Sequence, residues 1–172
     1  QAPTPVAQPL FVEDQARALP GVRTTCGSDA KDYIIEVNGG GVALTDLDND
    51  GDPDLIVVDG STLERSSKNE PGFPPRVFLN DGKGVFQAGG EAWAIAGGRW
   101  GMGIATGDVN GDGFVDVVIT QWGPTRLLLN RGGKGLAEAT DKAGFSGSRW
   151  GSSAALFDAD RDGALDLCVA NY

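Results

Sequence analysis

The sequence predicts an all-β protein. It is expected to be a partial β-propeller made of four-stranded blades of about 50 residues, with about two and a half blades in this chain. Three observations lead to this prediction. A block of sequence recurs along the chain, each complete block contains four short apolar runs separated by turn residues, and an acidic loop of constant pattern follows the first run of each block.

The repeat is clearest where long segments match. RWGMGIATGD, which begins at Arg99, matches RWGSSAALFD, which begins at Arg149, at an offset of 50 residues. The offset between Asp46 and Asp108 is 62 residues, because a polar insertion at residues 61–75 lengthens the first unit. The expected organisation is an extended Pro-rich tail at residues 1–9 and a partial propeller at 10–172, with units at about 41–98, 99–148 and 149–172.

The four strands of a unit can be read in order. The first, GIATGD, is rich in small residues, which suits an innermost strand where blades crowd around the axis. The second, DVVITQW, is apolar and β-branched. The third, TRLLLN, ends in a Gly-rich hairpin turn, and the fourth lies in GLAEATDKAGF. A β-sandwich is the alternative fold, but a sandwich does not require a 50-residue period.

Both ends of the chain bear on ring closure. Residues 10–22 resemble the fourth-strand segment but precede the first complete unit, which predicts an outer strand placed ahead of its own blade. The chain stops at Tyr172, after the second strand of the third unit. Propellers typically have four to eight blades, so we expect either that the sequence is a fragment, which we favour, or that other chains supply the missing blades.

Three acidic loops carry the chemistry. They read DLDNDGDPD from Asp46, DVNGDGFVD from Asp108 and DADRDGALD from Asp158. Calcium takes six to eight oxygen ligands, and this spacing offers side-chain oxygens at loop positions 1, 3, 5 and 9 and a carbonyl at position 7. We therefore expect about three calcium ions, one in each loop. The predicted ligands of the first loop are Asp46, Asp48, Asp50 and Asp54, with the carbonyl of Asp52. Those of the second are Asp108, Asn110, Asp112 and Asp116, with the carbonyl of Phe114. Those of the third are Asp158, Asp160, Asp162 and Asp166, with the carbonyl of Ala164.

The loops depart from an EF-hand. An EF-hand requires Glu at position 12, where these loops have Val57, Ile119 and Val169. It also requires flanking helices, whereas apolar β-branched runs flank these loops. The alternative is a set of Asp/Gly turns whose side chains make only local hydrogen bonds. That alternative does not require ligand spacing three times over.

Composition excludes several classes of function. The chain has no His and only two Cys, which excludes the usual zinc and Cys-His arrangements. The formal net charge of -10 argues against nucleic acid as a partner. No apolar run approaches the roughly 20 residues of a membrane-spanning helix.

The residues around the loops resemble the FG-GAP/VCBS class of propeller repeats, and more narrowly the cartilage acidic protein-like group associated with the ASPIC/UnbV domain. The matching stretches are CGSDAKDYIIEVNGGGVALTDLDNDGDPDLIVVDG, RWGMGIATGDVNGDGFVDVVIT and SSAALFDADRDGALDLCVANY. The resemblance implies a secreted propeller, often of seven blades, with calcium in the loops between strands. It carries over no catalytic residue.

A few residues outside the loops have alternative interpretations. Trp100 and Trp150 recur at one place in the repeat, which favours packing between blades over ligand binding. Cys26 and Cys168 lie far apart in sequence, and a disulfide between them remains open beside two free thiols. Glu36 stands beside a Gly run with no assignable catalytic partner.

The predicted function is a calcium-stabilised module of a periplasmic or extracellular protein that binds or scaffolds other proteins. Its expected partners are other protein chains or the missing blades of its own chain. The alternatives are a non-catalytic part of a larger secreted enzyme and an accessory subunit of an envelope or electron-transfer assembly. We expect no enzymatic activity in these residues, since no nucleophile–base pair or cofactor motif is present.

Overall fold

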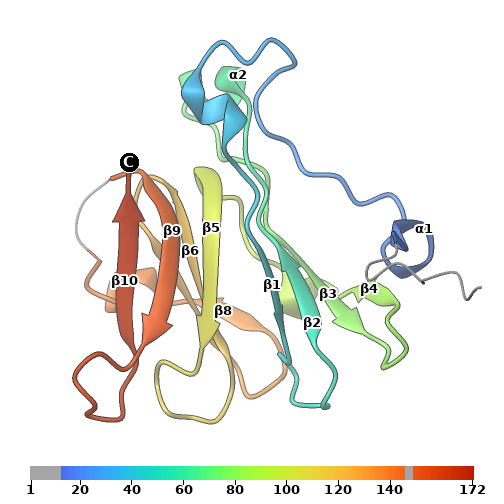
Figure 1. Ribbon diagram of the computed structural model, residues 1–172, viewed down its shortest axis with the longest axis vertical. Coiled ribbons are helices and arrows are strands. Elements are labelled where there is room, and N and C mark those ends of the chain that lie inside the picture. The colour runs from blue at the N-terminus through green and yellow to red at the C-terminus, as the bar shows by residue number, and fades with distance from the viewer. Residues whose placement is uncertain (1–12, 146–148) are drawn as a thin grey trace, which may run out of the picture.

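Three antiparallel β-sheets dominate the computed structural model, which describes residues 13–145 and 149–172 (Figure 1). The first sheet contains, in order, β1 (Val42–Thr45), β2 (Asp54–Val57), β3 (Arg76–Asn80) and β4 (Phe86–Ala88). The second contains β5 (Trp100–Gly107), β6 (Asp116–Trp122), β7 (Arg126–Asn130) and β8 (Leu136–Glu138). The third contains β9 (Gly151–Phe157) and β10 (Asp166–Asn171). The prediction of an all-β partial propeller is confirmed.

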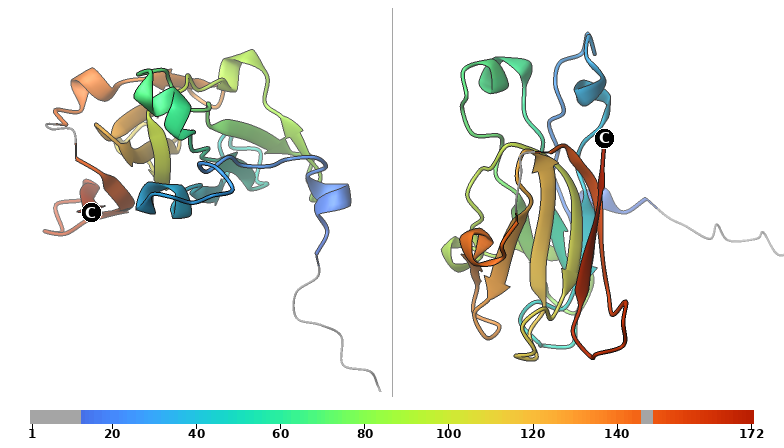
Figure 2. Two further views of the ribbon diagram at one scale, coloured as in Figure 1. Left: turned by 90° about the horizontal axis from the view of Figure 1, so that it is seen from above. Right: turned by 90° about the vertical axis from the view of Figure 1, so that its left-hand side faces the viewer.

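The first strands of the three sheets are neighbours. β1 contacts β5, and β5 contacts β9, so these strands form the inner side of the array (Figures 1 and 2). Small residues make this approach possible. A Cβ atom on Gly41 would lie 2.9 Å from the carbonyl oxygen of Met102, and one on Gly103 would lie 3.0 Å from that of Ser152. The small-residue character of the first strand is thus a packing requirement of adjacent blades.

The main core lies between the first and second sheets. Alternate residues of β2 and β6 face this core, because side chains of a strand point to opposite faces in turn. Its buried members are Leu47, Ile56, Val58, Val77, Trp93, Ile95, Val117, Ile119, Leu128 and Leu136. This seam holds the largest hydrophobic cluster of the described chain, and burial stabilises it by about 25 cal/mol per Å² of apolar area.

Short helices connect or cap the sheets. They are α1 (Gln15–Ala18), η1 (Ile34–Val37), α2 (Leu63–Ser67), η2 (Glu91–Trp93) and η3 (Thr140–Lys142). In the insertion at 61–75, the side chain of Thr62 accepts a hydrogen bond from the backbone N–H of Arg65 and caps α2. α2 and η1 lie at the end of the sheets opposite the β1–β2, β5–β6 and β9–β10 loops (Figure 1). None of the helices in the described ranges is both long and apolar enough to cross a membrane.

The predicted outer strand at the N-terminus is wrong over its described part. Residues 13–22 contain α1 rather than a strand, and residues 10–12 lie outside the described residues. When residues 10–22 are aligned with GLAEATDKAGF of the second unit, α1 aligns with η3, the short helix that follows β8. The Gln-Ala-Arg-Ala run favours a helix, and Arg17 pairs with Asp14 three residues earlier. Leu19 and Val22 then pack against the outer face of the first sheet.

Candidate metal centre

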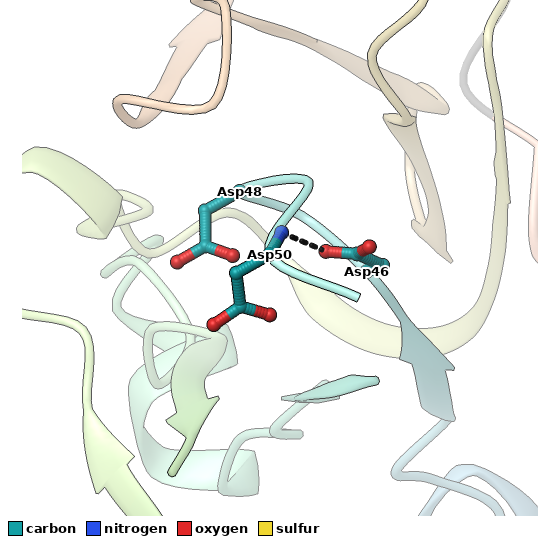
Figure 3. Close-up of side chains that lie close together, drawn as sticks. All are labelled: Asp46, Asp48 and Asp50. Atoms are coloured by element: carbon teal, nitrogen blue, oxygen red, sulfur yellow. Dashed lines mark hydrogen bonds between the residues drawn. The ribbon is translucent and has the colours of Figure 1, made fainter. Parts of the chain in front are cut away.

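The first acidic loop gathers three carboxylates at one point. Asp46, Asp48 and Asp50 each offer a carboxylate oxygen, and these oxygens lie within 4.8 Å of one another (Figure 3). The backbone N–H of Asp50 donates to Asp46 Oδ1 at 3.1 Å, which folds the loop back on its first residue. Asn49 and Gly51 have positive φ angles, 60° and 95°, so the chain reverses sharply here.

One hydrogen-bond scheme organises all three loops. The carboxylate at position 1 accepts from the N–H groups of positions 5 and 6 in the first loop and of positions 4, 5 and 6 in the others. The carboxylate at position 5 accepts from the N–H at position 7, with N···O distances of 2.9, 2.9 and 2.8 Å. The three loops therefore share one backbone shape.

The carboxylate at position 9 ties the first and second loops to their blades. Asp54 accepts from the N–H of Leu47 at 2.9 Å and from the N–H of Asn80, at the end of β3, at 2.9 Å. Asp116 accepts in the same way from Val109 at 3.0 Å and from Asn130, at the end of β7, at 2.8 Å. These carboxylates are thus held both by their own loop and by the third strand of the sheet, and their residues are 1% and 0% exposed.

Burial, backbone donors and neighbouring charges shift the pKa values of several loop carboxylates. Burial, together with the neighbouring charges of Asp54 and Asp50, raises the pKa of Asp48. Burial also raises the pKa of Asp54 and of Asp116, against the lowering effect of their backbone donors. Asp108 behaves oppositely, since backbone N–H groups, that of Gly113 first, lower its pKa. The loops therefore hold partly desolvated negative charge that a cation would stabilise.

The donor set fits a calcium ion. Asp48 Oδ1 is buried and has no hydrogen-bond partner, so it is an oxygen without its usual stabilising contact. In the described part of the chain, no Lys or Arg forms an ion pair with a loop aspartate. Clustered carboxylates with backbone oxygens nearby and no nitrogen or sulfur donor favour a hard cation such as calcium.

The comparison with protein families agrees with this geometry. A model of the FG-GAP-like repeat matches residues 46–119 and again residues 108–169, and both matches begin at the first aspartate of an acidic loop. This chain belongs to the FG-GAP-like repeat family. The two matched segments together span most of the chain. No curated protein matches the sequence.

The other two loops of these FG-GAP-like repeats differ in their carboxylates. The third brings together Asp158, Asp160 and Asp166, whose ligand oxygens also lie within 4.8 Å of one another. The second has Asn110 at position 3, and its side-chain N–H donates to Asp112 Oδ2 at 3.0 Å. Asp162 accepts from the N–H of Ala164 and was not part of the third cluster. The predicted ligands thus share a loop shape, while the carboxylate clusters found in the described residues contain six of them.

Sequence reasoning missed the asparagines of the third strand. Asn80 and Asn130 end the third strand of their units, and both hold the carboxylate at position 9 through their backbone N–H groups. Their side chains also cap the following turn, where Oδ1 accepts from Gly84 in one unit and from Gly133 in the other. The shared RxxLN-Gly pattern signalled the position, but only the fold shows that it faces the acidic loop.

Of the residues outside the loops that the sequence analysis named, Trp100, Cys26 and Glu36 lie in packing or local hydrogen-bonding environments. Trp100 is 1% exposed and packs with Ile35 and Met102, as expected for packing residues. Both cysteines are free, and Cys26 Sγ lies 2.9 Å from the carbonyl oxygen of Asn38. Glu36 is buried, and although burial alone would raise its pKa, donors led by Ser28 lower it. That carboxylate organises its own loop.

Proposed function

We propose that this chain is a calcium-stabilised FG-GAP-like repeat module that serves a non-catalytic, protein-binding or scaffolding role outside the cytoplasm. The observation that carries the proposal is the buried, unpartnered Oδ1 of Asp48 inside a cluster of three carboxylates. Such an oxygen is costly unless something positive meets it. The repetition of the same loop shape in all three units supports one shared ligand.

The residues of the loop would have different roles in binding the ion. Asp46, Asp48 and Asp50 would supply carboxylate oxygens in the first loop, together with the carbonyl of Asp52. Asp54 would hold the loop against β3 through the backbone hydrogen bonds that both its oxygens accept, and would share a remaining lone pair with the ion. The ion would supply positive charge and nothing else. The corresponding ligands of the other loops are those predicted from sequence at the same positions.

The proposed partners are further blades of the same repeat. Val42 and Leu44 on β1 are each 63% exposed. Their repeat equivalents on β5 are Ile104 and Thr106, and Ile104 packs into the seam between the first and second sheets. An exposed position whose counterpart is an interface residue is expected to meet a blade as well. We include in this proposal the unit boundaries at about 41–98, 99–148 and 149–172.

The proposal includes a location outside the cytoplasm and a relationship to the cartilage acidic protein-like group. Calcium is abundant outside the cytoplasm, so loops of even millimolar affinity would be filled in an extracellular or periplasmic protein. The narrower resemblance to the cartilage acidic protein-like group points to secretion as well. Binding of protein partners on the ring faces would follow from the way propellers present loops.

Calcium titration with matched variants tests the proposal. Isothermal titration calorimetry on chelator-treated protein should give saturable heat for calcium and a weaker response to magnesium. Asp48→Asn should remove about one binding site. Asp81→Asn is the matched control, because it removes one negative charge from a hairpin turn outside the three loops. The proposal fails if the unaltered protein binds no calcium, or if both variants bind as it does.

A further inference from the structure

Asn130 joins two acidic loops that belong to different blades. Its side-chain Nδ2 donates to the carbonyl of Leu47 in the first loop at 2.8 Å and to the carbonyl of Val115 in the second loop at 3.0 Å. Its backbone N–H donates to Asp116 Oδ1 at 2.8 Å. The residue is 5% exposed, so these bonds are made away from water, where they are strongest.

Two further contacts bring the same loops together. Asn49 of the first loop donates through Nδ2 to the carbonyl of Gly113 in the second at 3.1 Å. A Cβ atom on Gly133, in the turn after β7, would lie 2.8 Å from the carbonyl oxygen of Asp48. The first loop therefore meets the second blade at residues 47–49, among its clustered carboxylates.

We propose that Asn130 is a positioning residue that couples the first two calcium sites, so that an ion in either loop raises the affinity of the other. The proposal rests on the calcium function proposed above. Leu47 lies between Asp46 and Asp48, so the bond to its carbonyl fixes the backbone that carries two ligands of the first loop. The bonds to Val115 and Asp116 fix the last turn of the second loop. One planar amide thus holds both loops in one arrangement.

The physical basis is shared ordering. Without a cation, each loop contains carboxylates that repel one another, and the loop is free to open. Ordering one loop around an ion fixes Asn130, and the other loop then needs less ordering of its own when it binds. Coupling of this kind is reciprocal, because each ion must change the affinity of the other by the same factor.

Asn80 is the matched control within the same chain. Its N–H donates to Asp54, its Nδ2 donates to Pro53 at 3.0 Å, and its Oδ1 accepts from Gly84. The N–H and Nδ2 bonds correspond to those that Asn130 makes to Asp116 and Val115, while Oδ1 accepts from Gly82 and Gly84 in Asn80 and from Gly133 in Asn130. In the described part of the chain, Asn80 has no counterpart of the bond to Leu47. Comparing Asn130→Ala with Asn80→Ala therefore isolates that bond.

The experiment measures calcium affinity one loop at a time. Backbone NMR resonances of Gly51 report on the first loop during a calcium titration, and Asp112→Asn weakens the second loop. In the otherwise unaltered chain, Asp112→Asn should lower the affinity of the first loop by about 5-fold to 100-fold. In the Asn130→Ala background that effect should fall below about 2-fold, while in the Asn80→Ala background it should persist. Coupling that is absent from the unaltered chain, or unchanged by Asn130→Ala, would overturn the proposal.

A metal-free measurement separates this proposal from the calcium function. With chelator present, Asn130→Ala should speed amide hydrogen exchange at residues 47–51, and Asn80→Ala should leave it unchanged. If no variant binds calcium, the calcium function fails by itself, and the exchange data still decide whether Asn130 holds the first loop. Equal exchange in both variants would overturn the positioning role.

Discussion

The second and third acidic loops have the same length and nearly the same hydrogen bonds, yet their last carboxylates lie in opposite environments. Asp116 is 0% exposed and accepts from two backbone N–H groups. Asp166 is exposed and, among the described residues, accepts a hydrogen bond from Ala159 alone, at 2.8 Å. The missing donor corresponds to Asn130, which lies on the third strand of the second sheet. The third sheet as described has two strands.

This difference separates what a loop does alone from what a blade adds. The turn geometry at positions 1 to 7 is formed equally well in the two-stranded sheet, so it is a local property of the sequence. Burial of position 9 and the second hydrogen bond require β7 and the neighbouring blade. A calcium site in this repeat therefore has two parts. We call positions 1 to 7, which the loop sequence shapes, the local half, and position 9, which depends on the neighbouring strands and blade, the tertiary half.

The largest expected effect is a difference in unfolding free energy between core substitutions in the second and third units. Ile119 is 1% exposed in the seam between the first and second sheets, and its repeat equivalent, Val169, is half-buried. Ile119→Ala should lower the free energy of unfolding by about 3 kcal/mol, because it removes packed atoms and leaves a cavity. Val169→Ala should cost less than about 1 kcal/mol. Urea unfolding followed by tryptophan fluorescence measures both, and equal losses would show that the third sheet is covered in solution.

The next effect contrasts the two carboxylates directly. Asp116→Ala leaves the N–H groups of Val109 and Asn130 buried without an acceptor, which should cost about 2 kcal/mol or more in unfolding free energy. Asp166→Ala should cost less than about 1 kcal/mol, because water replaces its single bond. Asp116→Asn is the control, since it keeps one oxygen acceptor and removes the charge. Chemical denaturation in the presence of chelator makes the comparison, and a costlier Asp166→Ala would contradict it.

The local half of the site was predictable from sequence, and the tertiary half was not. The spacing of Asp46, Asp48 and Asp50 determines a turn within nine residues, so the pattern alone indicates their clustering. Asn130 and Leu47 are 83 residues apart in sequence, and no periodicity indicates that Asn130 Nδ2 lies 2.8 Å from the carbonyl oxygen of Leu47. The partial propeller followed from the repeat, since each unit buries its face only against another. The N-terminal helix was missed because a repeat match was interpreted as a strand throughout, although the matching segment ends in η3.

A smaller effect concerns local opening. β6 pairs with β5 and β7, while β10, in the part of the chain that the structure describes, pairs with β9 alone. Removal of calcium should therefore speed amide exchange in β10 by about 10-fold more than in β6, a difference of about 1.4 kcal/mol in opening free energy. Hydrogen exchange with mass spectrometry, with and without chelator, measures this difference. Uniform acceleration in both strands would show that the units open together and would remove the distinction between them.

The smallest effect lies within the second loop, where Asp108 and Asp116 should titrate on opposite sides of the ordinary aspartate pKa. Burial raises the pKa of Asp116 when no ion is bound, and backbone donors lower that of Asp108. The sign of each contribution to stability follows by linkage. Asp116 contributes stability below its ordinary value of 3.8, and this is lost as pH rises through its raised folded-state pKa. Asp108 contributes stability above 3.8, and this is lost as pH falls through its lowered pKa.

Carboxyl-carbon NMR titration in the presence of chelator should resolve the two aspartates, with Asp108→Asn and Asp116→Asn to assign them. Calcium should then lower the apparent pKa of both, because protons and the ion compete for the same oxygens. The contribution of Asp116 would reverse its sign and become one that acid removes. If Asp116 kept a raised pKa in saturating calcium, its carboxylate would be a structural anchor of the loop and not a ligand. Position 9 would then contribute to the site only by holding the loop in place, without binding the ion.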